Sequence, residues 1–119
     1  MTDTNDKVLD MEVIGALRAL EADGAPGLFN EIVELFLTDT PPRMKGLEAA
    51  SDAGDMPGVE AAAHSLKSSC GNLGATALVD LFKKIEMLGR EHDPLEIPSL
   101  VNKSNEEFVR VQSALLESK

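Results

Sequence analysis

One histidine in this chain lies in a pattern that would present it to solvent for chemistry. His64 falls within an apolar repeat that includes Val59, Ala63, Leu66 and Cys70, spaced as on one face of a helix. At about 100° per residue these apolar side chains share one face, and His64 points directly away from it. The sequence therefore predicts an imidazole on the outer face of a helix whose opposite face packs into a core.

The residues predicted to surround His64 are small for the solvent face of a helix. The helical wheel places Glu60 and Lys67 beside it. Small residues fill the rest of this face: Ala61, Ser68, Gly71 and, if the helix extends that far, Ala75. Glycine within a helix costs about 1 kcal/mol relative to alanine and gains nothing in water. We therefore interpret the four small residues as a surface that a partner approaches.

Two structural explanations compete with a chemical role for His64. Small residues would also let another helix of the same domain pack closely, which would leave His64 a buried, hydrogen-bonded core residue. Alternatively, an exposed histidine on a helix needs no function at all. Glu60 and Lys67 favour exposure, because charged side chains are rarely buried without a partner.

The sequence around His64 lacks the partners that most histidine chemistry requires. A metal site needs further ligands, and besides His92 there are only scattered carboxylates, without HExxH-type spacing. Cys70 lies on the opposite face of the predicted helix, and the neighbouring serines lack the glycine-rich turn of a serine nucleophile. No glycine-rich phosphate loop is present, so we expect neither a metal nor a cofactor. What remains is the imidazole as a nucleophile for a phosphoryl group, with Lys67 one turn along to neutralise the phosphoryl oxygens.

Helical periodicity recurs from end to end, whereas strand patterns are weak. A short first helix, about residues 10–22, ends at the breaker run 23–27. Four longer amphipathic segments follow, joined by short connections: about residues 28–50, 55–73, 74–88 and 95–115. The sequence therefore predicts an all-α fold, an antiparallel four-helix bundle with a short additional N-terminal helix.

Two prolines interrupt the second of these helical patterns. Pro41 and Pro42 lack the backbone N–H donors of a helix and should kink or interrupt it. The apolar spacing that includes Phe36 nevertheless resumes in phase at Met44 and Leu47. This favours one kinked long helix over two unrelated helices.

Length and charge restrict the domain count and the partners. The chain has 119 residues, and we expect a flexible N-terminus over residues 1–8 followed by a single domain over residues 9–119. Eleven Lys and Arg against 21 Asp and Glu give a formal charge of −10. Nucleic acids and anionic membranes bind clustered cations, so we expect neither as a partner.

The cysteine content and the N-terminus favour the cytoplasm. Cys70 is the single cysteine and cannot form an internal disulfide. The polar, acidic start of the chain is unlike a signal peptide. No apolar run approaches the roughly 20 residues that a membrane span needs. We therefore expect a cytoplasmic protein. The initiator Met followed by a near-complete domain favours a free-standing small protein, with a fragment of a larger kinase as the alternative.

Residues 64–75, HSLKSSCGNLGA, resemble a known motif. It is that of histidine-containing phosphotransfer (Hpt) domains, H-x-[LI]-K-G-[SA]-x-x-x-[LIV]-G. The flanking sequences are also similar: residues 36–43, FLTDTPPR, resemble the family's apolar stretch followed by Asp-x-Pro, and residues 47–55 resemble the end of that helix. The resemblance extends from about Leu9 to the C-terminus and implies a four-helix bundle.

The resemblance implies a phosphorelay carrier without kinase activity of its own. His64 would carry the phosphoryl group on Nε2 and exchange it with receiver-domain aspartates of response regulators and hybrid sensor kinases. Lys67 would steady the phosphoryl oxygens, and the Mg²⁺ and its acidic pocket would belong to the receiver. A carrier needs an open face, and the chain has no heptad seam, so we expect a monomer.

Three further positions follow from the resemblance. Ser68 stands where many members have glycine, and we expect the small hydroxyl to be tolerated. Glu86 stands where members have Gln or Glu; its carboxylate could accept from His64 Nδ1–H and leave Nε2 free, although a solvated helix residue is the alternative. Arg90 could contact the phosphate or the partner, or simply favour the C-terminal end of its helix.

A function from another class remains open. A helical adaptor or inhibitor could bind a receiver domain or kinase without being phosphorylated. Such a protein would keep its binding when His64 is replaced and would show no phosphotransfer at all.

Overall fold

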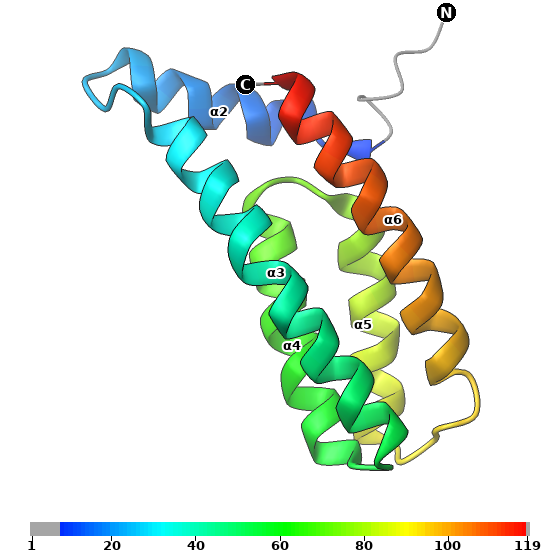
Figure 1. Cartoon of the computed structure of the whole chain (residues 1–119). Helices are drawn as coiled ribbons and strands as arrows, with labels where there is room; N and C mark the ends of the chain where they lie inside the picture. Colours follow the sequence, from blue (N-terminus) through cyan, green and yellow to red (C-terminus); the bar gives the residue numbers. More distant parts are fainter. Residues whose placement is uncertain (1–7, 119) are drawn as a thin grey trace, which may run out of the picture.

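The computed structural model describes residues 8–118, which form helices and no strand. The helices keep the labels of Figure 1. Their bounds are α2 Met11–Ala22, α3 Leu28–Asp52, α4 Met56–Asn72, α5 Thr76–Arg90 and α6 Ile97–Ser118. The all-α prediction is confirmed, and the predicted helix boundaries agree with these bounds to within a few residues.

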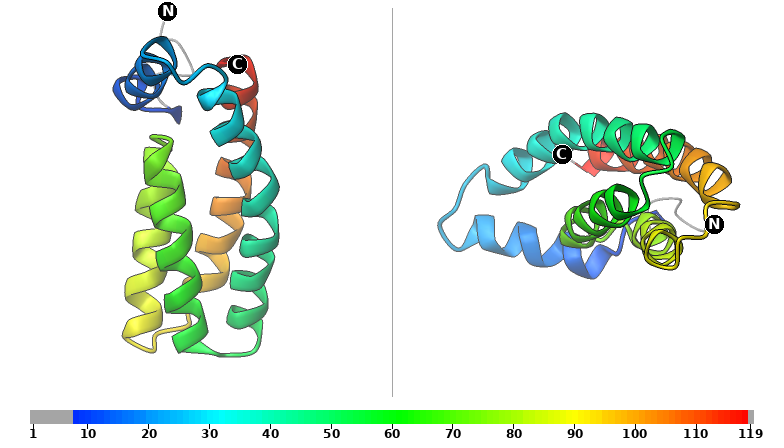
Figure 2. Two further views of the ribbon diagram at one scale, coloured as in Figure 1. Left: turned by 90° about the vertical axis from the view of Figure 1, so that its left-hand side faces the viewer. Right: turned by 90° about the horizontal axis from the view of Figure 1, so that it is seen from below.

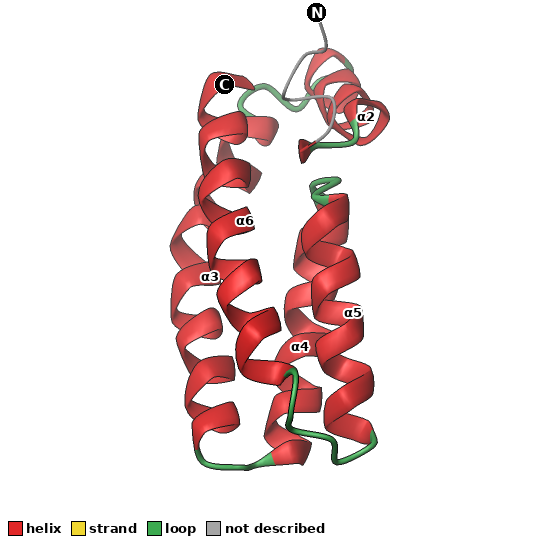
Figure 3. Cartoon of the chain, turned by 90° about the vertical axis from the view of Figure 1, so that its right-hand side faces the viewer, coloured by secondary structure: helices red, strands yellow, loops and turns green. Residues whose placement is uncertain are grey.

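Helices α3 to α6 form the bundle, and α2 crosses one of its ends. In Figures 1 and 3 the α3–α4 and α5–α6 connections lie at one end, and α2 lies at the other, beside the α4–α5 turn. The left-hand view of Figure 2 shows consecutive long helices running antiparallel. Within the described residues, none of the helices is long and apolar enough to cross a membrane.

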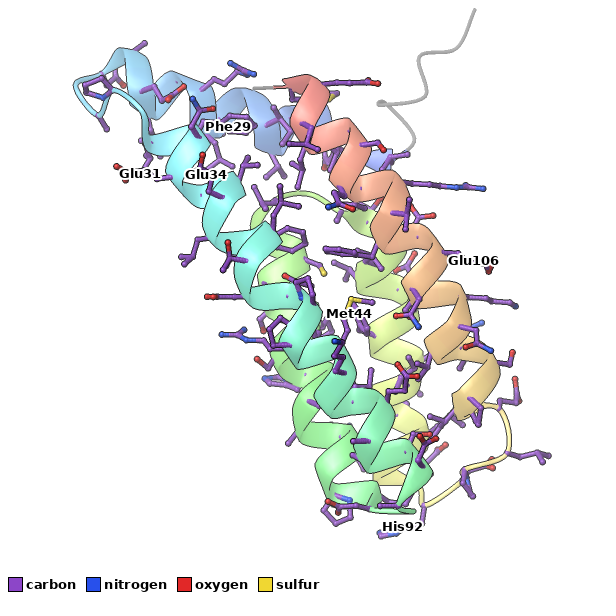
Figure 4. The ribbon with its side chains drawn as sticks, viewed as in Figure 1. Phe29, Glu31, Glu34, Met44, His92 and Glu106 are labelled. Atoms are coloured by element: carbon purple, nitrogen blue, oxygen red, sulfur yellow. The ribbon has the colours of Figure 1, made fainter. Side chains whose placement is uncertain are left out.

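The core is formed by one apolar stripe from each helix. Its largest fully buried side chains include Phe29, Phe82, Leu47, Leu66 and Leu115. Figure 4 shows Phe29 at the end of the bundle where α2 crosses. The burial of each such side chain stabilises the folded protein by roughly 1.5–3 kcal/mol. Because this stability comes from the core, residues on the outer faces of the helices can serve other functions.

Helix α3 runs without a break through Pro41 and Pro42 (Figure 1). Each proline lacks an N–H and therefore leaves a carbonyl one turn earlier without its helical donor. Phe36 and Thr40 before the prolines, and Met44 after them, are buried on one face of the helix. This continuous buried face offsets the lost hydrogen bonds, and the prediction of one long helix is confirmed.

Local signals set the ends of α4. The Asp55 carboxylate caps its start and accepts from Gly58 N–H at 3.0 Å. Its end is followed by Gly74, whose φ of +70° suits glycine. The Gly74 carbonyl accepts from Asp10 N–H at 2.7 Å, which ties the start of α2 to the α4–α5 turn.

The N-terminal boundary lies earlier than predicted. The expected flexible segment covers residues 1–8, of which residues 1–7 lie outside the described residues. Val8 is 5% exposed and belongs to the buried core cluster. Its apolar side chain is part of the core, so Val8 belongs with the folded domain.

Candidate functional site

His64 lies on the outer face of α4, with its side chain 63% exposed. Ala63, Leu66 and Cys70 on the opposite face are completely buried. The small residues near His64 therefore do not serve to bury it against another helix of the bundle. The interpretation of His64 as a buried core residue is wrong.

Glu86 on α5 lies directly beside His64. Its Oε2 is 3.0 Å from His64 Nδ1, and the glutamate is only 6% exposed. The alternative of a solvated helix residue is therefore wrong for Glu86. A carboxylate at this depth is stable only with charged or hydrogen-bonding partners.

Close packing of α5 on α4 brings Glu86 to this position. Gly89 is buried, and a Cβ added there would lie 3.0 Å from the backbone N of Glu60 and 3.2 Å from the carbonyl O of Met56. The missing side chain lets the two helix backbones approach. Glu86 is three residues earlier on the same face of α5, so the approach directs its carboxylate at the side of α4 that carries His64.

Lys67 forms an ion pair with the second oxygen of the Glu86 carboxylate. Its Nζ lies 2.6 Å from Glu86 Oε1, and its side chain is 28% exposed. The hydrogen bond from Lys67 lowers the pKa of Glu86, so the carboxylate is ionised at neutral pH despite its burial.

This ionised carboxylate selects one tautomer of His64. A carboxylate only accepts hydrogen bonds, so its contact with Nδ1 requires the proton to be on Nδ1. In the neutral ring the proton-free nitrogen is then Nε2, which keeps its lone pair. The arrangement holds an exposed imidazole with one defined nucleophilic atom.

Arg90 completes the ionic cluster and links α5 to α4. Its Nε lies 2.7 Å from Glu60 Oε2, and one terminal nitrogen lies 3.2 Å from Glu86 Oε2. The Arg90 side chain remains 60% exposed. Arg90 follows the last buried residue of α5, and its side chain connects two carboxylates at the edge of the site. This contact role adds to any favourable interaction of its charge with the helix dipole.

The small residues predicted around His64 are exposed, with one exception. Ala61, Ser68 and Gly71 are exposed on α4. A Cβ added at Gly71 would touch only Val79 Cγ2, at 3.9 Å, so packing within the domain does not require glycine there. The Ser68 hydroxyl donates to the His64 carbonyl at 3.2 Å.

The assignment of Ala75 to the partner surface is wrong. Helix α4 ends at Asn72, and the chain turns at Gly74 with a positive φ. Ala75 therefore leaves the periodicity of α4, precedes the first turn of α5 and is completely buried.

Sequence reasoning missed Arg43 on α3. Its NH1 donates to the hydroxyls of Ser65 at 3.2 Å and Ser69 at 3.1 Å, both on α4. Arg43 also lines a groove of about 160 Å³ between the two helices, together with Ile32, Leu35, Phe36, Asp39, Thr40, Ser69, Asn72 and Leu73. The pairing joins residues 22 and 26 positions apart, and no local sequence signal indicates it.

The remaining reactive side chains lie away from His64. Burial raises the pKa of the Cys70 thiol to about 12, which makes it unreactive at neutral pH. His92 lies in the connection after α5, at the end of the bundle opposite α2 (Figure 4). Across residues 8–118, no three His, Cys, Asp or Glu side chains are grouped as metal ligands.

Known proteins share this fold and sequence pattern. The family model described as "Hpt domain" matches residues 31–117. The crystal structure of histidine-containing phosphotransfer protein B (HptB) from Pseudomonas aeruginosa PAO1 is similar to this chain, with a TM-score of 0.82 and 27% sequence identity over 92% of each chain. Among curated proteins, no sequence matches this chain.

Proposed function

The chain belongs to the Hpt domain family and is a histidine phosphotransfer carrier of phosphorelays, and on that premise we propose that His64 is its phosphorylated residue. The observation that carries this assignment is the contact of His64 Nδ1 with Glu86 Oε2 at 3.0 Å on an exposed ring. It is the arrangement that a nitrogen nucleophile requires, with one nitrogen anchored and the other free.

The transfer step uses the Nε2 lone pair. Nε2 forms a bond to the phosphorus of an aspartyl phosphate on the partner, and the bond from phosphorus to the aspartate oxygen breaks. The aspartate leaves as a carboxylate, and the imidazole becomes positively charged, with its proton still on Nδ1. Glu86 faces that proton as an ionised carboxylate and stabilises the charge as it develops. The return step reverses these changes.

Lys67 is proposed to stabilise the phosphoryl group. In the free protein its ammonium group pairs with Glu86 Oε1, one turn along α4 from His64. An ammonium group has three N–H donors, so Lys67 can keep this contact and also donate to a phosphoryl oxygen. Glu86 thus holds Lys67 near the site before the phosphoryl group arrives.

The partners follow from the family. Hpt proteins interact with receiver domains, and we propose that receivers dock on the face of α4 that carries Ala61, Ser68 and Gly71. The Mg²⁺ for transfer is proposed to be held by the receiver, and the carrier to act as a cytoplasmic monomer without cofactor or kinase activity. Its charge of −10 disfavours nucleic acid and anionic membranes as alternative partners.

The test is transfer of label from a panel of phosphorylated receiver domains to the wild-type protein and to His64→Gln. We expect label on the wild type only, lost in acid and kept in alkali, as for a phosphohistidine. His92→Gln is the matched control, because His92 is the second histidine and lies at the end of the bundle; it should accept label like the wild type. Label on His64→Gln would refute the assignment.

A non-phosphorylated adaptor is the alternative function. It predicts that receivers bind both the wild type and His64→Gln with equal affinity and that neither becomes labelled. The circular dichroism spectrum of His64→Gln should match the wild type because the side chain is 63% exposed, and melting should fall only slightly through the lost contact with Glu86. An unfolded variant would instead indicate a structural role.

A further inference from the structure

Arg43 occupies the side of the His64 surface opposite the Glu86 cluster. The side of α4 that faces α5 carries Lys67, which contacts Glu86. The side that faces α3 carries Ser65 and Ser69, whose hydroxyls accept from Arg43 NH1. A partner centred on His64 therefore meets Arg43 at the edge of its contact area.

The charge of Arg43 differs from that of the other cations on this surface. Lys67 is paired with the Glu86 carboxylate, and Arg90 with those of Glu86 and Glu60. The two hydrogen bonds of Arg43 go to neutral hydroxyls, which orient the guanidinium without offsetting its charge. Within a protein of formal charge −10, Arg43 is thus an oriented positive group next to Ser65 and Ser69, on the side of α4 that faces α3.

The groove beside Arg43 combines this charge with apolar surface. Leu35 and Asp39, one helical turn apart on α3, both line this groove, and Leu35 is 63% exposed. The hydrogen bonds of Arg43 point across the groove to α4. Arginine beside exposed apolar side chains is the composition enriched in protein–protein interfaces.

We infer that Arg43 is a specificity-determining residue that pairs with a carboxylate of the docking receiver domain. The inference rests on the proposed function, which makes a receiver the occupant of this surface. A planar guanidinium with one terminal nitrogen already bound to two hydroxyls still has donors for a carboxylate. Because the two hydroxyls hold it in place, less side-chain entropy is lost on binding.

The experiment compares Arg43→Gln with Lys45→Gln, which removes the same charge from an exposed position on the same helix. Transfer from a phosphorylated receiver is measured over a series of salt concentrations. For Arg43→Gln we expect roughly a five- to tenfold fall in kcat/KM at low salt, mainly through KM, and a weaker dependence on salt than in the wild type. Lys45→Gln should stay within about twofold of the wild type.

A second phosphoryl donor separates docking from chemistry. Phosphoramidate transfers its phosphoryl group to Nε2 as its P–N bond breaks and ammonia leaves, and it needs no receiver surface. Arg43→Gln should accept from phosphoramidate as fast as the wild type. The double variant Ser65→Ala/Ser69→Ala keeps the charge but loses its anchors, and should show an intermediate effect with the receiver.

Four outcomes would overturn the inference. Equal kcat/KM for Arg43→Gln and the wild type would remove Arg43 from the interface. An equal fall in kcat/KM for Lys45→Gln would show that only the net charge of the protein matters. An equal fall for Arg43→Gln with phosphoramidate as donor would show that the substitution alters the reactivity of His64 and not receiver docking. If neither donor labels the wild type, the proposed function fails and the inference falls with it.

Discussion

Replacing Glu86 by Gln isolates the charge of the buried carboxylate, because the two side chains have almost the same shape. Glu86 contacts His64 Nδ1 at 3.0 Å and Lys67 Nζ at 2.6 Å, and is 6% exposed. Hydrogen bonds to charged groups contribute roughly 1.5–3 kcal/mol and neutral ones about 0.5–1.5 kcal/mol. These two contacts, and the 3.2 Å contact from Arg90, would all be weakened, but the cost of burying a charged carboxylate would be removed as well. We therefore expect Glu86→Gln to lower the free energy of unfolding near pH 7 by about 1–2 kcal/mol.

The loss should depend on pH in a defined direction. Lys67 lowers the pKa of Glu86 in the folded protein, so the carboxylate stabilises the fold above its unfolded pKa, about 4.3 for a free glutamate. This contribution disappears as the pH falls through the lower, folded pKa. Glutamine has no such titration. The difference between the wild type and Glu86→Gln should therefore shrink on acidification below about pH 4.

Urea unfolding followed by circular dichroism, near pH 7 and at decreasing pH, measures both quantities. Glu107→Gln on α6 is the control with the opposite sign. Burial raises the pKa of Glu107, with Arg110 opposing the shift, so its charged form destabilises the fold as the pH rises. This variant should be as stable as the wild type, or more stable, near pH 7. A stability of Glu86→Gln equal to that of the wild type, or a loss that does not change with pH, would refute the reasoning.

The remaining predictions concern packing at both ends of α4 and in the core. Gly89→Ala should lower the free energy of unfolding by about 1–3 kcal/mol through overpacking, because the added Cβ would lie 3.0 Å from Glu60 N and push α5 away from α4. The same displacement should slow transfer from receivers. Urea unfolding and transfer assays test both effects, and unchanged values for both would contradict the prediction. Gly74→Ala places a Cβ at φ +70° and 3.0 Å from Asp10 O. It should therefore lower the free energy of unfolding by at least about 1–2 kcal/mol and increase proteolysis of α2. Stability equal to the wild type would argue against strain at this turn. Cys70 should react with a thiol reagent only on unfolding, since burial raises its pKa to about 12, and rapid labelling of the native protein would show an open core.

The sequence alone determined the helices and the direction of His64. Their apolar positions recur with the helical period, and that period depends only on the local backbone. The same local rule placed Val59 and Leu66 in the core and His64 outside, as the structure has them. It also supported a single α3 through Pro41 and Pro42, because the buried face keeps its phase across them.

Local rules failed where the chain changes direction. The helical wheel extended the surface of α4 to Ala75, but α4 ends at Asn72 and the turn at Gly74 directs Ala75 into the core. A wheel holds only as long as the helix continues, and helix ends depend on one or two residues in special conformations.

Only the tertiary structure decided which side chains complete the surface around His64. The resemblance to Hpt domains suggested Glu86 as the partner of His64 but left a solvated helix residue as the alternative. Its burial follows from the close approach of α5 at Gly89. The contacts of Arg43 with Ser65 and Ser69 likewise depend on how α3 lies against α4. Such contacts join residues far apart in the chain, and their geometry is set by the packing of whole helices.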